Sequence, residues 1–255
     1  MTTLATLSKF VLFKMTLPAV LKSTLAGVGL MMVGSQFATA ADAAANAHPT
    51  IRAMSGVGPT DHLVAKSTAL LVIDFQNEYF TGRMPIPDGM TALNKTLDLI
   101  EFADKANIQV IHVQHVSPAG AAVFAVDGKT VDFHPLMKPR AQDKVVQKTS
   151  VSVFASTDLD AQLKKAKIDT LIIAGLMTHA CVAGAARDAV PLGYNVVVAS
   201  DATATRAITR ANGQSVSGNE LQNSSLAEIE DTFGSVLTSS QILGLTVDCS
   251  TRCFT

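Results

Sequence analysis

Short apolar runs alternate with longer amphipathic stretches along the chain from residue 67 onward. Four short, mainly apolar runs are candidate strands: Ala69–Ile73, Ile108–Val113, Thr170–Ala174 and Asn195–Ala199. Between and after them, apolar residues recur at helical spacing over Met90–Ala106, Asp158–Ala166, Cys181–Leu192 and Leu226–Leu237. Short apolar runs of this kind are typical of strands buried on both faces of a parallel sheet. The alternation therefore predicts an α/β fold with a doubly wound, mostly parallel sheet and helices on both faces.

The pattern places one folded domain over residues 67–248, a size usual for a single α/β domain. Two connections, 117–144 and 209–224, are polar or mixed and show little periodicity. Loops of this length in a compact domain are usually functional. We expect both to lie outside the sheet, where such folds bind ligands, and 117–144 to be a lid that determines the substrate.

Residues 1–40 differ from the rest of the chain and read as a signal peptide. They contain three lysines and no acidic residue, then an apolar stretch over 25–34 and the Ala38-Thr39-Ala40 pattern of a cleavage site. The apolar stretch is shorter than the roughly 20 residues needed to span a bilayer. We expect a periplasmic or secreted protein cleaved after Ala40, without stable membrane insertion; a retained anchor and a transit peptide are the alternatives. Residues 41–66 are expected to form a loosely ordered N-terminus.

The charge and cysteine content of the chain limit the classes of partner that we expect for it. Without the three leader lysines, 17 basic residues face 21 acidic ones, a net charge of −4. The absence of a basic surplus and of Trp argues against a nucleic-acid partner and favours a small-molecule substrate. In the tail 249–255, Cys249 and Cys253 could form a small-loop disulfide in an oxidising compartment or stay as free thiols, and Cys181 stands alone.

Polar residues at the ends of the predicted strands are the candidate chemistry, because those ends meet in one crevice. Asp74, His115, the segment 175–181 and Asp201 occupy such ends, and Lys148 follows the apolar pair Val145-Val146. A thiol, a carboxylate and an amine brought together form a workable nucleophilic set.

Each member of this set also has a structural interpretation. Cys181 lies where a strand passes into a helix, and a helix N-terminus favours thiolate, but a Cys beside Ala and Val is also a common core residue. Asp74 could exchange a proton with the thiol or cap a helix, and Lys148 could be a surface lysine.

Three stretches of the sequence, in the expected order, resemble the isochorismatase-like cysteine hydrolases. They are Leu71 to Phe80 (LVIDFQNEYF), Val145 to Lys148 with Phe154 and Leu159, and Ile173 to Val182 (IAGLMTHACV) continuing to Asp201-Ala202. The resemblance covers about residues 67–243. It implies a hydrolase, and oligomers of the chain.

The resemblance also implies roles for individual residues. Cys181 would be the nucleophile, Asp74 would shuttle its proton and Lys148 would favour the charged forms. The N–H groups of Met177 and Cys181 would form an oxyanion hole after a cis peptide between Leu176 and Met177. We also expect the substrate to contact Phe80, Phe154 and His115, although His115 could equally be a wall residue of the crevice.

The metal site of nicotinamidases, with its Asp-x-His, has no counterpart after the second strand, which reads Val113-Gln-His115-Val. His112 and His115 would face opposite sides of a strand, so we expect no catalytic metal and no cofactor. His179 is expected to start a helix and Asp201 to order a loop. The sequence thus predicts a metal-independent hydrolase of a small amide or related bond. Vinyl-ether hydrolysis of the isochorismate type and a non-catalytic binding or redox-sensing protein remain alternatives.

Overall fold

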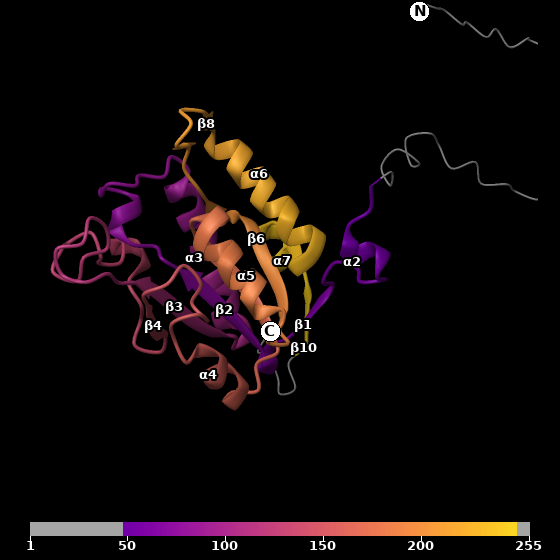
Figure 1. The fold of residues 1–255 in the computed structure, drawn as a ribbon. Coiled ribbons are helices and arrows are strands. Elements are labelled where there is room, and N and C mark those ends of the chain that lie inside the picture. The colour runs from indigo at the N-terminus through magenta and orange to yellow at the C-terminus, as the bar shows by residue number, and fades with distance from the viewer. Residues whose placement is uncertain (1–47, 249–255) are drawn as a thin grey trace, which may run out of the picture. The chain divides into compact units, whose positions relative to one another are not determined.

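The computed structural model describes residues 48–248, which contain a six-stranded sheet in the order β4–β3–β2–β5–β6–β9 (Figure 1). The strands are β2 (Thr68–Ile73), β3 (Gln109–His115), β4 (Lys144–Lys148), β5 (Thr170–Leu176), β6 (Asn195–Ala204) and β9 (Ser235–Leu237). Every neighbouring pair in this sheet is parallel. The predicted α/β class with a parallel sheet is confirmed.

Helices cover both faces of the sheet (Figure 1). The α-helices of the described residues are α2 (Ile51–Met54), which buries no residue, and α3 (Gly89–Ala106), α4 (Leu159–Lys165), α5 (Ala183–Ala189), α6 (Gly218–Glu228) and α7 (Ser239–Leu243). Alternate residues of β2 enter two separate cores: Leu70 and Val72 pack with α3 and α7, whereas Leu71 and Ile73 pack with α4 and α5. Because β2 is buried along its whole length, its sequence is continuously apolar.

The helices α3 and α4 lie within one residue of their predicted bounds, but the C-terminal region differs from its prediction. The expected loop 209–224 contains a short hairpin of β7 (Ile208–Thr209) and β8 (Ser215–Val216) and the start of α6. A capping box begins that helix, in which Ser217 and Glu220 satisfy each other's backbone N–H groups.

The helix predicted over 226–237 is wrong in its second half. The α-helix continues as a π-helical turn over Ile229–Phe233, and residues 235–237 form the edge strand β9. Gly234 is the point of change: a Cβ there would lie 2.6 Å from the carbonyl oxygen of Val196 on β6. The chain approaches β6 so closely that it leaves the helix and joins the sheet.

The expectation of a loosely ordered N-terminus over 41–66 is wrong for its described part, residues 48–66. The Thr50 side chain caps α2, and the Ile51 N–H donates to Asp231 at 2.8 Å. Further along, β1 (His62–Val64) pairs in parallel with β10 (Thr246–Asp248). These partners are more than 170 residues away in sequence, so the local small-residue composition did not reveal them.

The predicted signal peptide 1–40, residues 41–47 and the tail with Cys249 and Cys253 lie outside the described residues. Within residues 48–248, no helix is both long and apolar enough to cross a membrane.

Candidate active site

Asp74, Lys148 and Cys181 lie together at the carboxyl ends of three strands. Asp74 directly follows β2, Lys148 is the last residue of β4, and Cys181 lies five residues beyond β5. All three are buried: Asp74 and Lys148 have no exposed surface and Cys181 is 5% exposed. The three strands are near neighbours in the sheet, so its topology gathers residues that are far apart in sequence.

A close approach between β2 and β5 holds Asp74 in place. Gly175 on β5 has φ +150°, and a Cβ there would lie 2.4 Å from the carbonyl oxygen of Ile73. Asp74 itself has a left-handed φ of +54°, and its N–H donates to Val113 at 2.9 Å. Non-glycine residues rarely adopt this conformation, and such strain concentrates at functional sites.

The turn that carries Cys181 is not a regular helix start. The peptide bond between Leu176 and Met177 is cis, and residues Thr178–Val182 form a π-helical turn before α5 begins at Ala183. The predicted helix over Cys181–Leu192 is therefore shorter than expected, and Cys181 precedes it.

The Lys148 ammonium stands at the centre of the cluster. Its Nζ lies 2.8 Å from Asp74 Oδ2 and 3.3 Å from Cys181 Sγ. It also lies 2.8 Å from His115 Nδ1 and 3.1 Å from the carbonyl oxygen of Ser150. A lysine has three N–H donors, so this side chain is fully engaged and fixed in position. The surface-lysine interpretation of Lys148 is wrong.

The same cluster offers three potential metal ligands, because one donor atom each of Asp74, His115 and Cys181 lies within 4.8 Å of the others. Lys148 Nζ, however, contacts all three of these side chains at 2.8–3.3 Å. A divalent cation at that point would meet the ammonium at contact distance, and like charges repel strongly in a buried site. The donor set suits the lysine and does not fit a metal.

Burial dominates the electrostatics of the acid and the thiol. Burial and, after it, the Asp74 charge raise the pKa of Cys181 to about 12, although Lys148 opposes both. Burial also raises the pKa of Asp74, and Lys148 again opposes the shift. The expectation of a thiolate favoured by a helix N-terminus is thus not met in the resting site. A neutral thiol beside a carboxylate can lose its proton during attack rather than before it.

His115 serves this cluster as a hydrogen-bond acceptor. Burial and the Lys148 charge lower the pKa of His115 to about 4. The ring is therefore neutral near pH 7, and its Nδ1 accepts from Lys148. His115 contacts the lysine directly, which is a more specific placement than a wall of the crevice.

Three further residues singled out in the sequence have other contacts. Phe80 packs on His134 with ring centroids 4.4 Å apart. The Phe154 ring stacks on that of Tyr194, which immediately precedes β6, and its expected contact with the substrate stays a prediction. His179 lies in the π-helical turn, 2.5 Å from the Thr205 hydroxyl.

Asp201 has a different structural role from the one expected. It lies inside β6, which continues to Ala204, and accepts from the N–H and hydroxyl of Ser239 at the start of α7. It therefore orders a helix start rather than the loop after its own strand.

Sequence reasoning missed four residues near the cluster. Gln76 binds the backbone of both His115 and Val131, which ties the 117–144 segment to the site. Tyr79 is buried, and the charges of Cys181 and Asp74 add to burial in raising its pKa. Phe124 contacts both Tyr79 and His115. Gln76 and Tyr79 belong to the stretch LVIDFQNEYF, which was the available signal.

Arg206 is the fourth missed residue. It is partly buried, and its Nε has no partner among the described residues. Burial lowers the pKa of His179, and the positive charge of Arg206 lowers it further. Nothing in the local sequence distinguishes it from a surface arginine.

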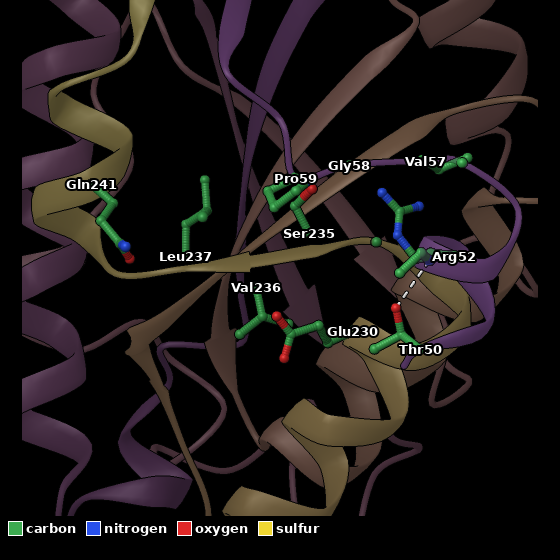
Figure 2. Close-up of a pocket in the computed structure, with 13 residues that line it drawn as sticks. Thr50, Arg52, Val57, Gly58, Pro59, Glu230, Ser235, Val236, Leu237 and Gln241 are labelled. Carbon is green, nitrogen blue, oxygen red and sulfur yellow. Dashed lines mark hydrogen bonds between the residues drawn. The ribbon is translucent and has the colours of Figure 1, made fainter. Parts of the chain in front are cut away.

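A separate groove of about 570 Å³ lies beside the edge strand β9. Figure 2 shows Thr50 and Arg52 toward one end of it, Leu237 and Gln241 toward the other, and β9 between them. It contains none of the predicted catalytic residues, and β9 is two strands away from β5. This groove and the cluster of Asp74, Lys148 and Cys181 thus lie in different parts of the molecule.

Comparison with known proteins identifies the family. Residues 68–241 match the Isochorismatase domain. The chain belongs to the isochorismatase family. A secreted isochorismatase effector of Verticillium dahliae is 32% identical over 193 residues, covering 76% of this chain and 98% of that protein. A streptothricin hydrolase of Streptomyces noursei is 36% identical over 56% of this chain and 51% of its own length.

Solved structures agree with this assignment. An isochorismatase of Pseudomonas putida matches with a TM-score of 0.70 and 26% identity, over 75% of this chain and 97% of that one. A cysteine hydrolase of Pseudomonas syringae matches with a TM-score of 0.69 and 25% identity, over 77% and 96%. This isochorismatase-family chain is a hydrolase.

Proposed function

We propose that this hydrolase cleaves a small amide through a covalent intermediate on Cys181, without a metal ion. The observation that carries the proposal is the placement of Lys148 Nζ, 2.8 Å from the Asp74 carboxylate and 3.3 Å from Cys181 Sγ. One fixed cation thus contacts both the proton acceptor and the nucleophile, which is the arrangement that thiol activation requires.

The reaction has two halves. Cys181 Sγ attacks the carbonyl carbon as its proton passes to Asp74, and the N–H groups of Met177 and Cys181 stabilise the oxyanion. Collapse breaks the C–N bond, and Asp74 returns the proton to the leaving amine. Water then attacks the thioester with Asp74 as base, releasing the acid and restoring the thiol.

Burial suits this sequence of proton transfers. Burial raises the pKa of both Cys181 and Asp74, and the raised pKa of Asp74 makes its carboxylate a stronger base toward the thiol proton. Relatives named as nicotinamidase and as maleamate amidohydrolase, at 32% and 25% identity, support an amide substrate, whereas the isochorismatase effector, at 32%, supports the vinyl-ether alternative.

A hydrolysis screen of small amides and isochorismate, on chelator-treated full-length protein, tests the proposal. Cys181→Ala should lower turnover roughly 10⁶-fold, the scale seen when a covalent nucleophile is removed. Cys253→Ala is the matched control and should keep full activity. Undiminished turnover in Cys181→Ala would overturn the covalent mechanism, and loss of turnover on chelation would overturn metal independence.

We also propose that the chain is exported and cleaved after Ala40. The Ala38-Thr39-Ala40 pattern and the secreted Verticillium dahliae relative support this. N-terminal sequencing of the exported protein should begin at Ala41; an N-terminus at Met1 would contradict it.

A further inference from the structure

Phe124, in the 117–144 segment, contacts His115, the histidine that accepts a hydrogen bond from Lys148. It is 4% exposed although it lies in a long connection between β3 and β4. Its ring centroid is 5.3 Å from that of Tyr79, in an edge-on arrangement, and 4.9 Å from that of His115. Aromatic rings at these separations are in favourable contact.

The two rings that Phe124 contacts are next to the reacting groups. His115 accepts from Lys148, which in turn lies 3.3 Å from Cys181 Sγ. Tyr79 is close enough to Cys181 and Asp74 that their charges help to raise its pKa. Phe124 therefore adds an apolar wall to a cluster whose other members are polar or charged.

The backbone holds Phe124 in this position. Its φ is +54°, a left-handed conformation that is a rare outlier for a bulky residue. Ser117 holds the surrounding loop from both sides: its N–H donates to the Phe124 carbonyl at 2.8 Å, and its own carbonyl accepts from Val126 at 3.0 Å. A strained residue that is fixed by its neighbours is typical of a ligand clamp.

We propose that Phe124 is a specificity-determining residue that limits the bulk of the group admitted to Cys181, so that the substrate is compact beside its scissile carbonyl. This inference rests on the proposed function, because it assumes that substrate reaches Cys181 Sγ. The inference concerns which substrates reach Cys181, whereas the proposed mechanism concerns how a bound substrate is hydrolysed.

The chain offers a matched control in Phe133. This residue belongs to the same connection and contacts a histidine of the same strand, His112, at 5.8 Å. His112 packs against Asp143 and not against the catalytic cluster. Truncation of Phe133 therefore removes an equal side chain from the same segment without changing the wall beside Cys181.

Alkylation with N-ethylmaleimide and N-phenylmaleimide tests the inference without a known substrate. The rate at Cys181 is followed by peptide mass spectrometry, which separates it from Cys249 and Cys253. The ratio of the phenyl to the ethyl rate cancels any change in thiol pKa, because both reagents react with the same thiolate. We expect Phe124→Ala to raise this ratio about tenfold and Phe133→Ala to leave it unchanged.

Phe124→Leu keeps an apolar side chain of smaller bulk and should give an intermediate ratio, which guards against a folding defect in the alanine variant. An unchanged ratio in both Phe124 variants, with wild-type thermal unfolding, would overturn the inference while leaving the covalent mechanism intact. Full activity of Cys181→Ala would instead overturn the mechanism, whatever the alkylation ratio.

Discussion

Two histidines three residues apart on β3 have opposite surroundings. His112 is buried on the α3 face, with Nε2 3.3 Å from Asp143 and its ring near Phe133. His115 faces the other way, with Nδ1 2.8 Å from Lys148 and its ring near Phe124. Each histidine thus has one charged partner and one phenylalanine from the same connection. The two partners carry charges of opposite sign.

The sign of the partner's charge distinguishes the structural role of His112 from the role of His115 beside the catalytic cluster. Burial lowers the pKa of both rings, but Asp143 opposes the shift at His112, whereas Lys148 adds to it at His115. Asp143 is also bound by Arg140, which pairs with Asp104 on α3, so the His112 cluster fastens the connection to a helix. The His115 cluster instead holds a cation beside a thiol.

The largest effect should come from exchanging the two charged partners for neutral residues. Lys148→Met removes the cation between Asp74 and Cys181 and should lower turnover at least roughly 1,000-fold, with a loss of about 3 kcal/mol in unfolding free energy. Asp143→Asn should leave turnover within about twofold and cost about 1–3 kcal/mol. Steady-state rates and urea unfolding of both variants make the comparison. Similar losses of turnover in the two variants would contradict the separate roles assigned to Lys148 and Asp143.

Asp74→Asn should move hydrolysis and thiol reactivity in opposite directions. Removal of the negative charge leaves Lys148 free to stabilise the thiolate, so the pKa of Cys181 falls and alkylation by iodoacetamide at pH 8 should rise about tenfold. Hydrolysis should fall roughly 1,000-fold because the proton acceptor is lost. If alkylation slowed instead, the Asp74 charge would not be what raises the thiol pKa.

Substitution of the histidines themselves should separate activity from stability. His115→Asn should lower turnover about 10- to 100-fold through misplacement of Lys148, with little effect on unfolding. His112→Asn should cost about 1–3 kcal/mol and leave turnover unchanged at a temperature where the variant is folded. Thermal unfolding followed beside activity distinguishes them; a reversed pattern would show that the roles are misassigned.

The smallest expected effect is a pH dependence of stability. The folded His115 has a pKa of about 4, whereas a histidine in the unfolded chain titrates near 6.5. Between these values the unfolded chain binds a proton that the folded chain does not, so stability falls as pH decreases from 6.5 to 4. Urea unfolding at pH 7 and pH 4.5 should show a smaller drop in His115→Asn than in wild type. Equal drops would place the titration elsewhere.

The sequence predicted the four central strands β3, β2, β5 and β6 and the cluster at their ends from local patterns, but not the edge strands β4 and β9. Continuous apolar runs mark strands buried on both faces, and parallel topology alone brings the ends of β2, β4 and β5 together. The roles of His115 and Phe124 were not predictable in this way. They depend on how Gln76 binds both His115, 39 residues away, and Val131 of the 117–144 segment, 55 residues away.

The C-terminal errors have a similar origin. Helical spacing continues past Glu228, and only the close approach of Gly234 to β6 converts the chain to an edge strand. The thiol pKa was misjudged because the position of a helix start is local, whereas burial is a property of the whole site. The Ser217-x-x-Glu220 spacing of a capping box is visible in the sequence and indicates that a helix begins at Gly218, before the predicted start at Leu226.

Partitioning of the acyl group between water and added hydroxylamine tests the central claim most directly. Two amides with the same acyl group and different leaving amines, drawn from the screen, are hydrolysed in the same hydroxylamine concentration. A common thioester on Cys181 predicts the same ratio of hydroxamate to acid from both, because the leaving amine has departed before the second nucleophile acts. A ratio that depends on the leaving amine, or acid without hydroxamate, would contradict the covalent account.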